Sequence, residues 1–275
     1  TWAYGRRVVL LRVLYLAIFG LSALAVMGIA SHPGVSRTDV ALPMAPLVIV
    51  SLLLINAQAV TSMTNERDSH ALDLLLVTQL TSREFIFGKL IGAVYNTKEM
   101  VILPLLLIAT LHMSGCVGLE SAVYLVGGWL VLCGFAVVLG FHCGLRYVRT
   151  RTAIGVSLAT LLFLAIGIAT SMRILVAFSD SFAFQLQPFL ATIVGGGIGL
   201  YAALGARNPS PATFAAAFYC PIATFYALTS FLLGHTMAVF LAVATAYGFA
   251  VAAMLVPALY EFDAATGRAG ESVEN

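Results

Sequence analysis

Residues 40–65, VALPMAPLVIVSLLLINAQAVTSMTN, contain no charged side chain, whereas residues 66–89, ERDSHALDLLLVTQLTSREFIFGK, contain seven. The first stretch exceeds the roughly 20 apolar residues that a helix needs to span a bilayer. Seven charges at the membrane centre would cost on the order of 20 kcal/mol, against about 5 kcal/mol returned by ten apolar side chains. Residues 40–65 are therefore predicted to span a membrane, and residues 66–89 to lie outside it.

The rest of the chain repeats the pattern of long uncharged runs. Of the 275 residues, 61% are hydrophobic and 9% are charged, and the mean hydropathy is +1.00, whereas soluble domains are about 45–50% apolar and 25% charged. Further uncharged runs occupy residues 13–36, 100–119, 121–145, 152–172, 181–206 and 208–260, and the last divides at Gly234-His235. The sequence predicts one all-α, polytopic transmembrane domain over residues 1–275, with six to eight hydrophobic segments and a polar tail at 261–275. It leaves open whether residues 181–233 form spans or an outer hairpin.

The positions of lysine and arginine predict the orientation. With the N-terminus inside, only Arg37 and Arg173 of the 14 Lys and Arg residues fall in outer connections. Because cytoplasmic loops carry an excess of these residues, the N-terminus is predicted to be cytoplasmic. The first apolar run is longer than the 7–15 residues of a signal-peptide core. We therefore expect an uncleaved first span, with a short native segment before Thr1.

Residues 64–85 are predicted to form a cytoplasmic loop that contains a short amphipathic helix. Its leucines recur on one helical stripe and its polar residues on another, namely Leu72, Leu75, Leu76 and Leu80 against Glu66, His70 and Asp73. Two interpretations stay open on spacing alone. The helix either lies on the membrane with its leucines in lipid, or it presents its charges to a cytoplasmic partner.

A second helix start follows this loop. The Thr81 hydroxyl can accept from the backbone N–H of Glu84, while the Glu84 carboxylate can accept from the N–H of Thr81. This capping box is predicted to begin the third span, which would continue as one helix to about His112, loosened near Pro104.

Residues 65–93, NERDSHALDLLLVTQLTSREFIFGKLIGA, resemble the first cytoplasmic loop of type-2 ATP-binding-cassette (ABC) exporter permeases. In that family a segment of mixed charge leads into a Thr- and Leu-rich helix, a T-x-L-(S/T) break, and a Glu and Gly-Lys start to the next span. The matching residues are Glu66, Leu72, Leu74, Leu75, Leu76, Thr78, Leu80, Ser82, Glu84, Gly88 and Lys89. Residues 144–167, GLRYVRTRTAIGVSLATLLFLAIG, are similar to the basic loop and fifth span of the same permeases. Together with the order of spans, the resemblance covers residues 1–172 and departs at His70-Ala71, where Gly-Thr is more usual.

The resemblance implies a permease subunit of a cell membrane (inner or plasma membrane) that has no catalytic residue, is not an enzyme and binds no cofactor. ATP and magnesium would be bound by two cytoplasmic ABC ATPase subunits, and a second permease copy or a homologous permease would complete the transporter. The implied partner-docking residues are Glu66, Arg67, Asp68, Leu72, Asp73, Leu75 and Leu76, followed by Thr81, Glu84, Gly88 and Lys89 at the helix cap and the start of the third span.

The chain itself lacks a phosphate-binding loop. That motif reads G-x-x-x-x-G-K-[ST], but Arg83 stands at its first glycine and Leu90 at its hydroxyl position. The cysteines and histidines show no metal-ligand spacing, and the basic residues are too dispersed to predict nucleic-acid binding. No substrate-binding residue is evident.

Weaker candidates for functional or packing residues lie within the predicted spans. Lys98 and Glu99 are either functional intramembrane charges or interfacial residues that reach water, and the second is favoured. Gly140-x-x-x-Gly144 and Gly195-x-x-x-Gly199 are predicted to permit close helix packing. The alternative functions are an ATP-independent carrier that couples through Lys98 or Glu99, a membrane enzyme acting on lipid, and a membrane scaffold that transports nothing.

Overall fold

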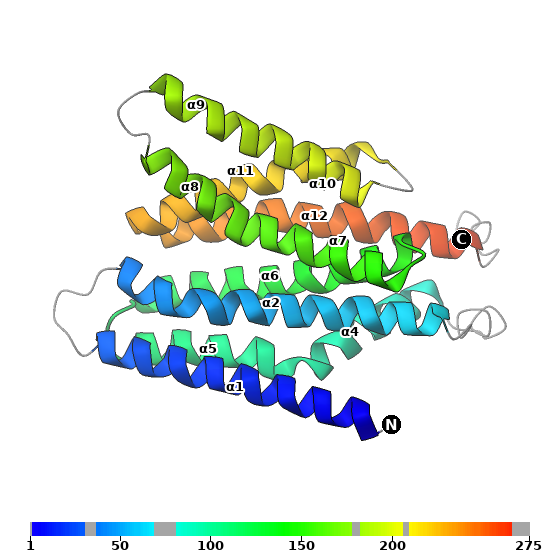
Figure 1. Ribbon diagram of the computed structural model, residues 1–275, viewed down its shortest axis with the longest axis horizontal. Coiled ribbons are helices and arrows are strands. Elements are labelled where there is room, and N and C mark those ends of the chain that lie inside the picture. Colours follow the sequence, from blue (N-terminus) through cyan, green and yellow to red (C-terminus); the bar gives the residue numbers. More distant parts are fainter. Residues whose placement is uncertain (1, 31–36, 69–80, 178–181, 206–208, 266–275) are drawn as a thin grey trace.

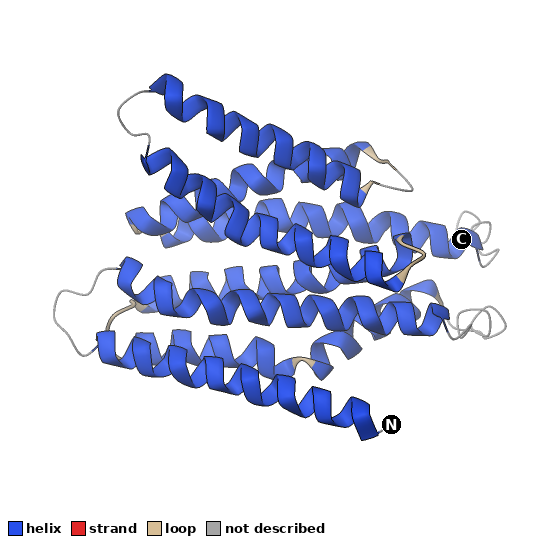
Figure 2. Ribbon diagram, in the orientation of Figure 1, coloured by secondary structure: helices blue, strands red, loops and turns tan. Residues whose placement is uncertain are grey.

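The computed structural model describes residues 2–30, 37–68, 81–177, 182–205 and 209–265, which are almost wholly helical and contain no strand (Figure 2). The helices are α1 (Trp2–Ala30), α2 (Arg37–Asp68), α4 (Ser82–Asn96), α5 (Lys98–Met113), α6 (Leu119–Arg146), α7 (Thr150–Leu162), α8 (Ile168–Ala177), α9 (Phe182–Leu190), α10 (Gly196–Leu204), α11 (Pro211–Leu233) and α12 (Thr236–Ala265). Short π-helical segments join α7 to α8 and α9 to α10.

Seven of the described helices are long and apolar enough to cross a membrane, when α7–α8 and α9–α10 are each counted as one helix. If the bent pair α4–α5 is a single span, the number is eight. This confirms a multi-pass membrane protein of six to eight segments. The stretch whose topology the sequence left open holds two such helices, Phe184–Leu204 and Pro211–Leu233. This stretch therefore contains two helices of spanning length and composition, which favours two further spans over an outer hairpin.

Both described ends of the chain lie at the same end of the bundle, together with the last turn of α2 and the first turn of α4 (Figure 1). We call this the inner end, because its position relative to the lysines and arginines predicts that it faces the cytoplasm. The opposite, outer end holds the turns from α5 to α6 and from α11 to α12. Helix α6 packs against both α2 and α12 and forms the centre of the bundle.

The predicted third span is not one continuous helix. Helices α4 and α5 meet at Thr97 with a bend of 60°, where the backbone leaves the helical region at φ −113° and ψ 21°. The Thr97 hydroxyl donates to the Ala93 carbonyl at 2.9 Å, a type of side-chain bond that often bends helices. Pro104 lies inside α5, which continues through it without a break, so the bend of this span is not at the proline.

A buried polar seam joins α2, α6 and α7. The Asn56 amide donates to the Ala136 carbonyl at 2.9 Å and accepts from the Ser157 hydroxyl at 2.7 Å, and both polar side chains are fully buried. Such groups need partners where water is absent. A Cβ atom on Gly140 would lie 2.6 Å from the Asn56 carbonyl oxygen, and one on Gly144 would lie 2.9 Å from a Met63 side chain. The predicted close packing at this glycine pair is confirmed.

The second glycine pair behaves differently. A Cβ atom on Gly195 or Gly199 would meet no atom within 4 Å, so the predicted close approach at these two positions was wrong. The intervening glycines carry the contacts, because Gly196 faces the Phe163 ring and Gly197 faces the Phe218 ring. The spacing identified the correct helix but not the face that packs.

Candidate functional site

The predicted docking residues fall partly within the described structure. Leu72, Asp73, Leu75 and Leu76 lie outside the described residues, as does the side chain of Asp68. Glu66 and Arg67 lie in the last turn of α2, which continues to Asp68. Helix α2 thus extends into the predicted loop 64–85, and α4 begins at Ser82; most of that predicted loop lies outside the described residues.

Arg67 points toward the end of α6. Its Nη1 atom donates to the carbonyl oxygens of Gly144, at 3.0 Å, and Tyr147. The last carbonyls of a helix have no partner within the helix and carry partial negative charge, so a guanidinium group is a suitable donor there. Arg67 therefore fixes the inner end of α2 to the turn between α6 and α7.

Glu66 forms an ion pair with Lys89. Both side chains are a little over one quarter exposed, and the Lys89 ammonium group also lies 5.9 Å from the centre of the Phe85 ring. The pair connects the last turn of α2 to the second turn of α4. The two helices on either side of the loop are thus held together directly.

The capping box at the start of α4 is confirmed. The Glu84 amide donates to the Thr81 hydroxyl at 3.2 Å, and the Thr81 amide donates to a Glu84 carboxylate oxygen at 3.0 Å. Gly88 is exposed, and a Cβ atom there would meet nothing within 4 Å. Within the described residues, packing does not require a glycine at position 88.

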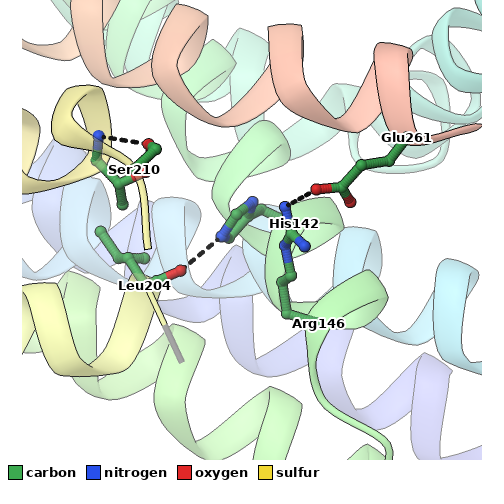
Figure 3. A network of polar contacts seen from close by, with 6 residues as sticks. His142, Arg146, Leu204, Ser210 and Glu261 are labelled. Atoms are coloured by element: carbon green, nitrogen blue, oxygen red, sulfur yellow. Dashed lines mark hydrogen bonds and ion pairs between the residues drawn. The ribbon is translucent and has the colours of Figure 1, made fainter. Parts of the chain in front are cut away.

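Side chains near the end of α6 bind the last carbonyls of α10. His142 Nε2 lies 3.0 Å from the Leu204 carbonyl oxygen (Figure 3), and the Tyr147 hydroxyl donates to the Ala203 carbonyl at 2.6 Å. Burial raises the pKa of the Tyr147 phenol above its ordinary value of 10.0, which keeps it a neutral donor. These two contacts attach α10 to the centre of the bundle at the inner end.

Arg146 and Glu261 add an ion pair at the same level. Arg146 Nη2 lies 2.9 Å from Glu261 Oε1 and joins α6 to α12 (Figure 3). Sequence reasoning did not single out His142, Arg146, Tyr147 or Glu261 as a group, because their partners lie 56 to 115 positions away. The one local signal was that His142 and Arg146 are four residues apart and so share a helix face.

Lys98 and Glu99 begin α5, directly after the bend. The Lys98 ammonium group is exposed and lies 4.9 Å from the centre of the Tyr95 ring. Glu99 lies 3.8 Å from Arg12 of α1, and both side chains are more than one third exposed. Neither residue is enclosed among the helices.

The outer half of the bundle contains a cavity of about 690 Å³. It lies between the first turns of α2, the second half of α5, the first half of α6 and the start of α12. Helix α5 therefore reaches from the bend at Thr97 to the wall of this cavity, which includes Pro104, Ile108 and Leu111.

No group of three or more His, Cys, Asp or Glu side chains that could hold a metal ion occurs within the described residues. The polar contacts described at the inner end join helices α2, α4, α6, α10 and α12 to one another or to the α6–α7 turn. The chain matches no known protein-family model, no curated protein and no solved structure.

Proposed function

We propose that this chain is the transmembrane permease subunit of an ABC exporter in the inner or plasma membrane of the cell. It moves a substrate outward by alternating access, while separate cytoplasmic ATPase subunits bind ATP and magnesium. A second permease copy, or a homologous permease, completes the transporter. The chain itself performs no ATP chemistry.

One observation carries this proposal: the loop that resembles a permease docking loop is directly joined to the helices that line the outer cavity. Glu66 and Lys89 connect the two sides of the loop, α4 begins at the capping box beside it, and α5 continues beyond the 60° bend to the cavity wall. A partner that displaces the loop would move α4, and the bend at Thr97 would pass that movement to α5.

The docking itself is proposed to be helix-in-groove binding. The leucine stripe, with Leu72, Leu75 and Leu76, would supply apolar contact, and Asp68 and Asp73 would set the register by charge. Glu66 and Arg67 are proposed to support docking indirectly, by holding the end of α2 in place, because both side chains bind other parts of this chain. An ATP-independent carrier gains no support from Lys98 and Glu99, since neither is enclosed.

Purification from native membranes tests this proposal. A tagged chain is expected to bring down a nucleotide-binding subunit, and Leu75→Asp with Leu76→Asp is expected to remove it, because two charges would enter the apolar contact. The matched control is Val77→Asp with Thr78→Asp, which adds the same charge on the opposite side of the predicted helix. Recovery of the unchanged chain without any nucleotide-binding subunit would contradict the proposal.

A further inference from the structure

The outer cavity has the size of a ligand site. Its volume of about 690 Å³ falls within the roughly 300–1,000 Å³ of small-molecule pockets in proteins. It lies between helices that are long and apolar enough to cross a membrane. It extends from the α5–α6 turn at the outer end of the bundle down to Trp129 and Leu132 of α6, so much of it lies along the length of these apolar helices.

Among the described residues that line the cavity, none has a charged side chain. Most of its polar side chains already bind groups of the protein: the Thr236 and Ser121 hydroxyls lie 3.0 Å apart, and Trp129 Nε1 donates to the Val101 carbonyl at 3.0 Å. The Tyr124 ring stacks on Phe240, and its hydroxyl makes no hydrogen bond to another described residue. The lining thus suits a neutral, largely apolar ligand with at most one or two oxygen atoms to bind.

Water is a poor occupant of such a space, because a buried water needs two to four polar partners. An empty cavity would also forfeit the dispersion contacts of its walls. The surrounding bilayer supplies a filling molecule of matching chemistry, since hydrocarbon chains are neutral and flexible and are already present at this depth.

We infer that the cavity is a binding site for the hydrocarbon chain of a lipid, taken up from the outer half of the membrane. The ester oxygen at the top of such a chain is a suitable acceptor for the Tyr124 hydroxyl. That the bound lipid or a lipid-linked molecule is the exported substrate rests on the proposed function. The binding site itself does not, because every residue that forms it belongs to this chain.

Two residues of α6 make this inference testable. Trp129 lines the cavity and is 5% exposed, and the chain contains only one other tryptophan, Trp2. Gly128 also lines the cavity and is buried, yet a Cβ atom on it would meet nothing within 4 Å. A side chain added at Gly128 would therefore enter the open space. Gly134, on the same helix, has equal room but is exposed and is not part of the lining.

The experiment uses the chain with Trp2→Phe, placed in vesicles of phosphatidylcholine with or without bromine atoms on the acyl chains. Bromine quenches tryptophan fluorescence on contact, so the ratio of the two intensities reports whether an acyl chain reaches Trp129. We expect clear quenching in the Trp2→Phe chain and in its Gly134→Leu variant, and loss of most of that quenching in Gly128→Leu. Equal quenching in the two leucine variants, or none in the Trp2→Phe chain, would overturn the inference.

Gly128→Ala guards against a folding artefact. A single methyl group has room at this position, and alanine favours a helix over glycine, so this variant should fold and lose only part of the quenching. No loss in Gly128→Ala together with no loss in Gly128→Leu would again contradict lipid occupancy. No ATPase takes part in this measurement, so it can fail while the proposed function stands, and the absence of an ATPase partner would leave it unaffected.

Discussion

At the inner end of the bundle, side chains of α2, α4, α6 and α12 bind one another or the last carbonyls of neighbouring helices. At the outer end, α2, α5, α6 and α12 surround a cavity whose described lining residues are all uncharged. The first arrangement fixes helices to each other through directional bonds, and the second leaves room for a guest molecule. Under the proposed function, the inner end would receive a displacement from the ATPase partner and transmit it through the helices, and the outer cavity would bind and release its ligand.

The buried polar seam of α2, α6 and α7 holds the bundle together between its two ends. Disrupting the contact of α2 with α6 in this seam should therefore cause the largest loss of stability. In Gly140→Leu the new side chain would collide with the Asn56 carbonyl, and we expect a loss of about 3 kcal/mol or more in unfolding free energy. Thermal unfolding in detergent, followed by circular dichroism, measures it. Gly134→Leu on the same helix is the control, because its Cβ meets nothing within 4 Å; equal melting temperatures would refute the account of the seam.

Removal of Arg67 should loosen the inner end alone. Arg67→Ala leaves the Gly144 and Tyr147 carbonyls without this charged donor, and such bonds contribute about 1.5–3 kcal/mol. Chemical denaturation of the purified chain gives the loss. Arg83→Ala removes an exposed arginine of the same end and should cost much less. A similar cost for both variants would show that the Arg67 bonds do not stabilise the fold.

Tyr147→Phe tests one bond between α6 and α10. Loss of the donor to the Ala203 carbonyl should cost about 1 kcal/mol. Because burial raises the pKa of Tyr147 above 10.0, the native state holds this proton more tightly than the unfolded state does. The stabilisation is therefore complete below pH 10 and declines as the pH rises above that value. Unfolding of both forms from pH 7 to 11 should show their difference shrinking, whereas a constant difference would contradict this assignment.

The smallest loss of stability is expected at the outer end. Thr236→Val removes the hydrogen bond to Ser121 beside the cavity, and a neutral bond of this kind contributes about 0.5–1.5 kcal/mol. A double-mutant cycle with Ser121→Ala isolates the pair. A coupling larger than the cost of Arg67→Ala would reverse the contrast between the two ends.

Local signals in the sequence predicted local structure well. The capping box at Thr81 and Glu84 depends on residues three apart, and the structure forms it as predicted. The bend at Thr97 could not be predicted from a proline, because a threonine hydroxyl and a non-helical backbone mark the break. The contacts of His142 and Tyr147 could not be predicted, because both acceptors are backbone carbonyls of a distant helix.

The two glycine pairs illustrate the same limit. Both have the spacing that brings helices together, but only Gly140 and Gly144 face a neighbouring backbone or side chain at close range. Which face of a helix packs depends on the other helices, and a single spacing does not contain that information. The end of α2 is a similar case, since Glu66 and Arg67 belong to that helix while their partners lie on α4 and at the α6–α7 turn.

ATP turnover by the complex purified through a tag on this chain tests the central claim most directly. The double variant Glu66→Lys with Lys89→Glu exchanges the two charges and so preserves the internal ion pair. ATP turnover should persist in this variant. Adding Asp73→Lys inverts a charge of the predicted docking helix, and turnover should be lost while membrane insertion and helix content stay unchanged. Unchanged turnover in the triple variant would contradict coupling through this loop and would assign its helix to the membrane surface.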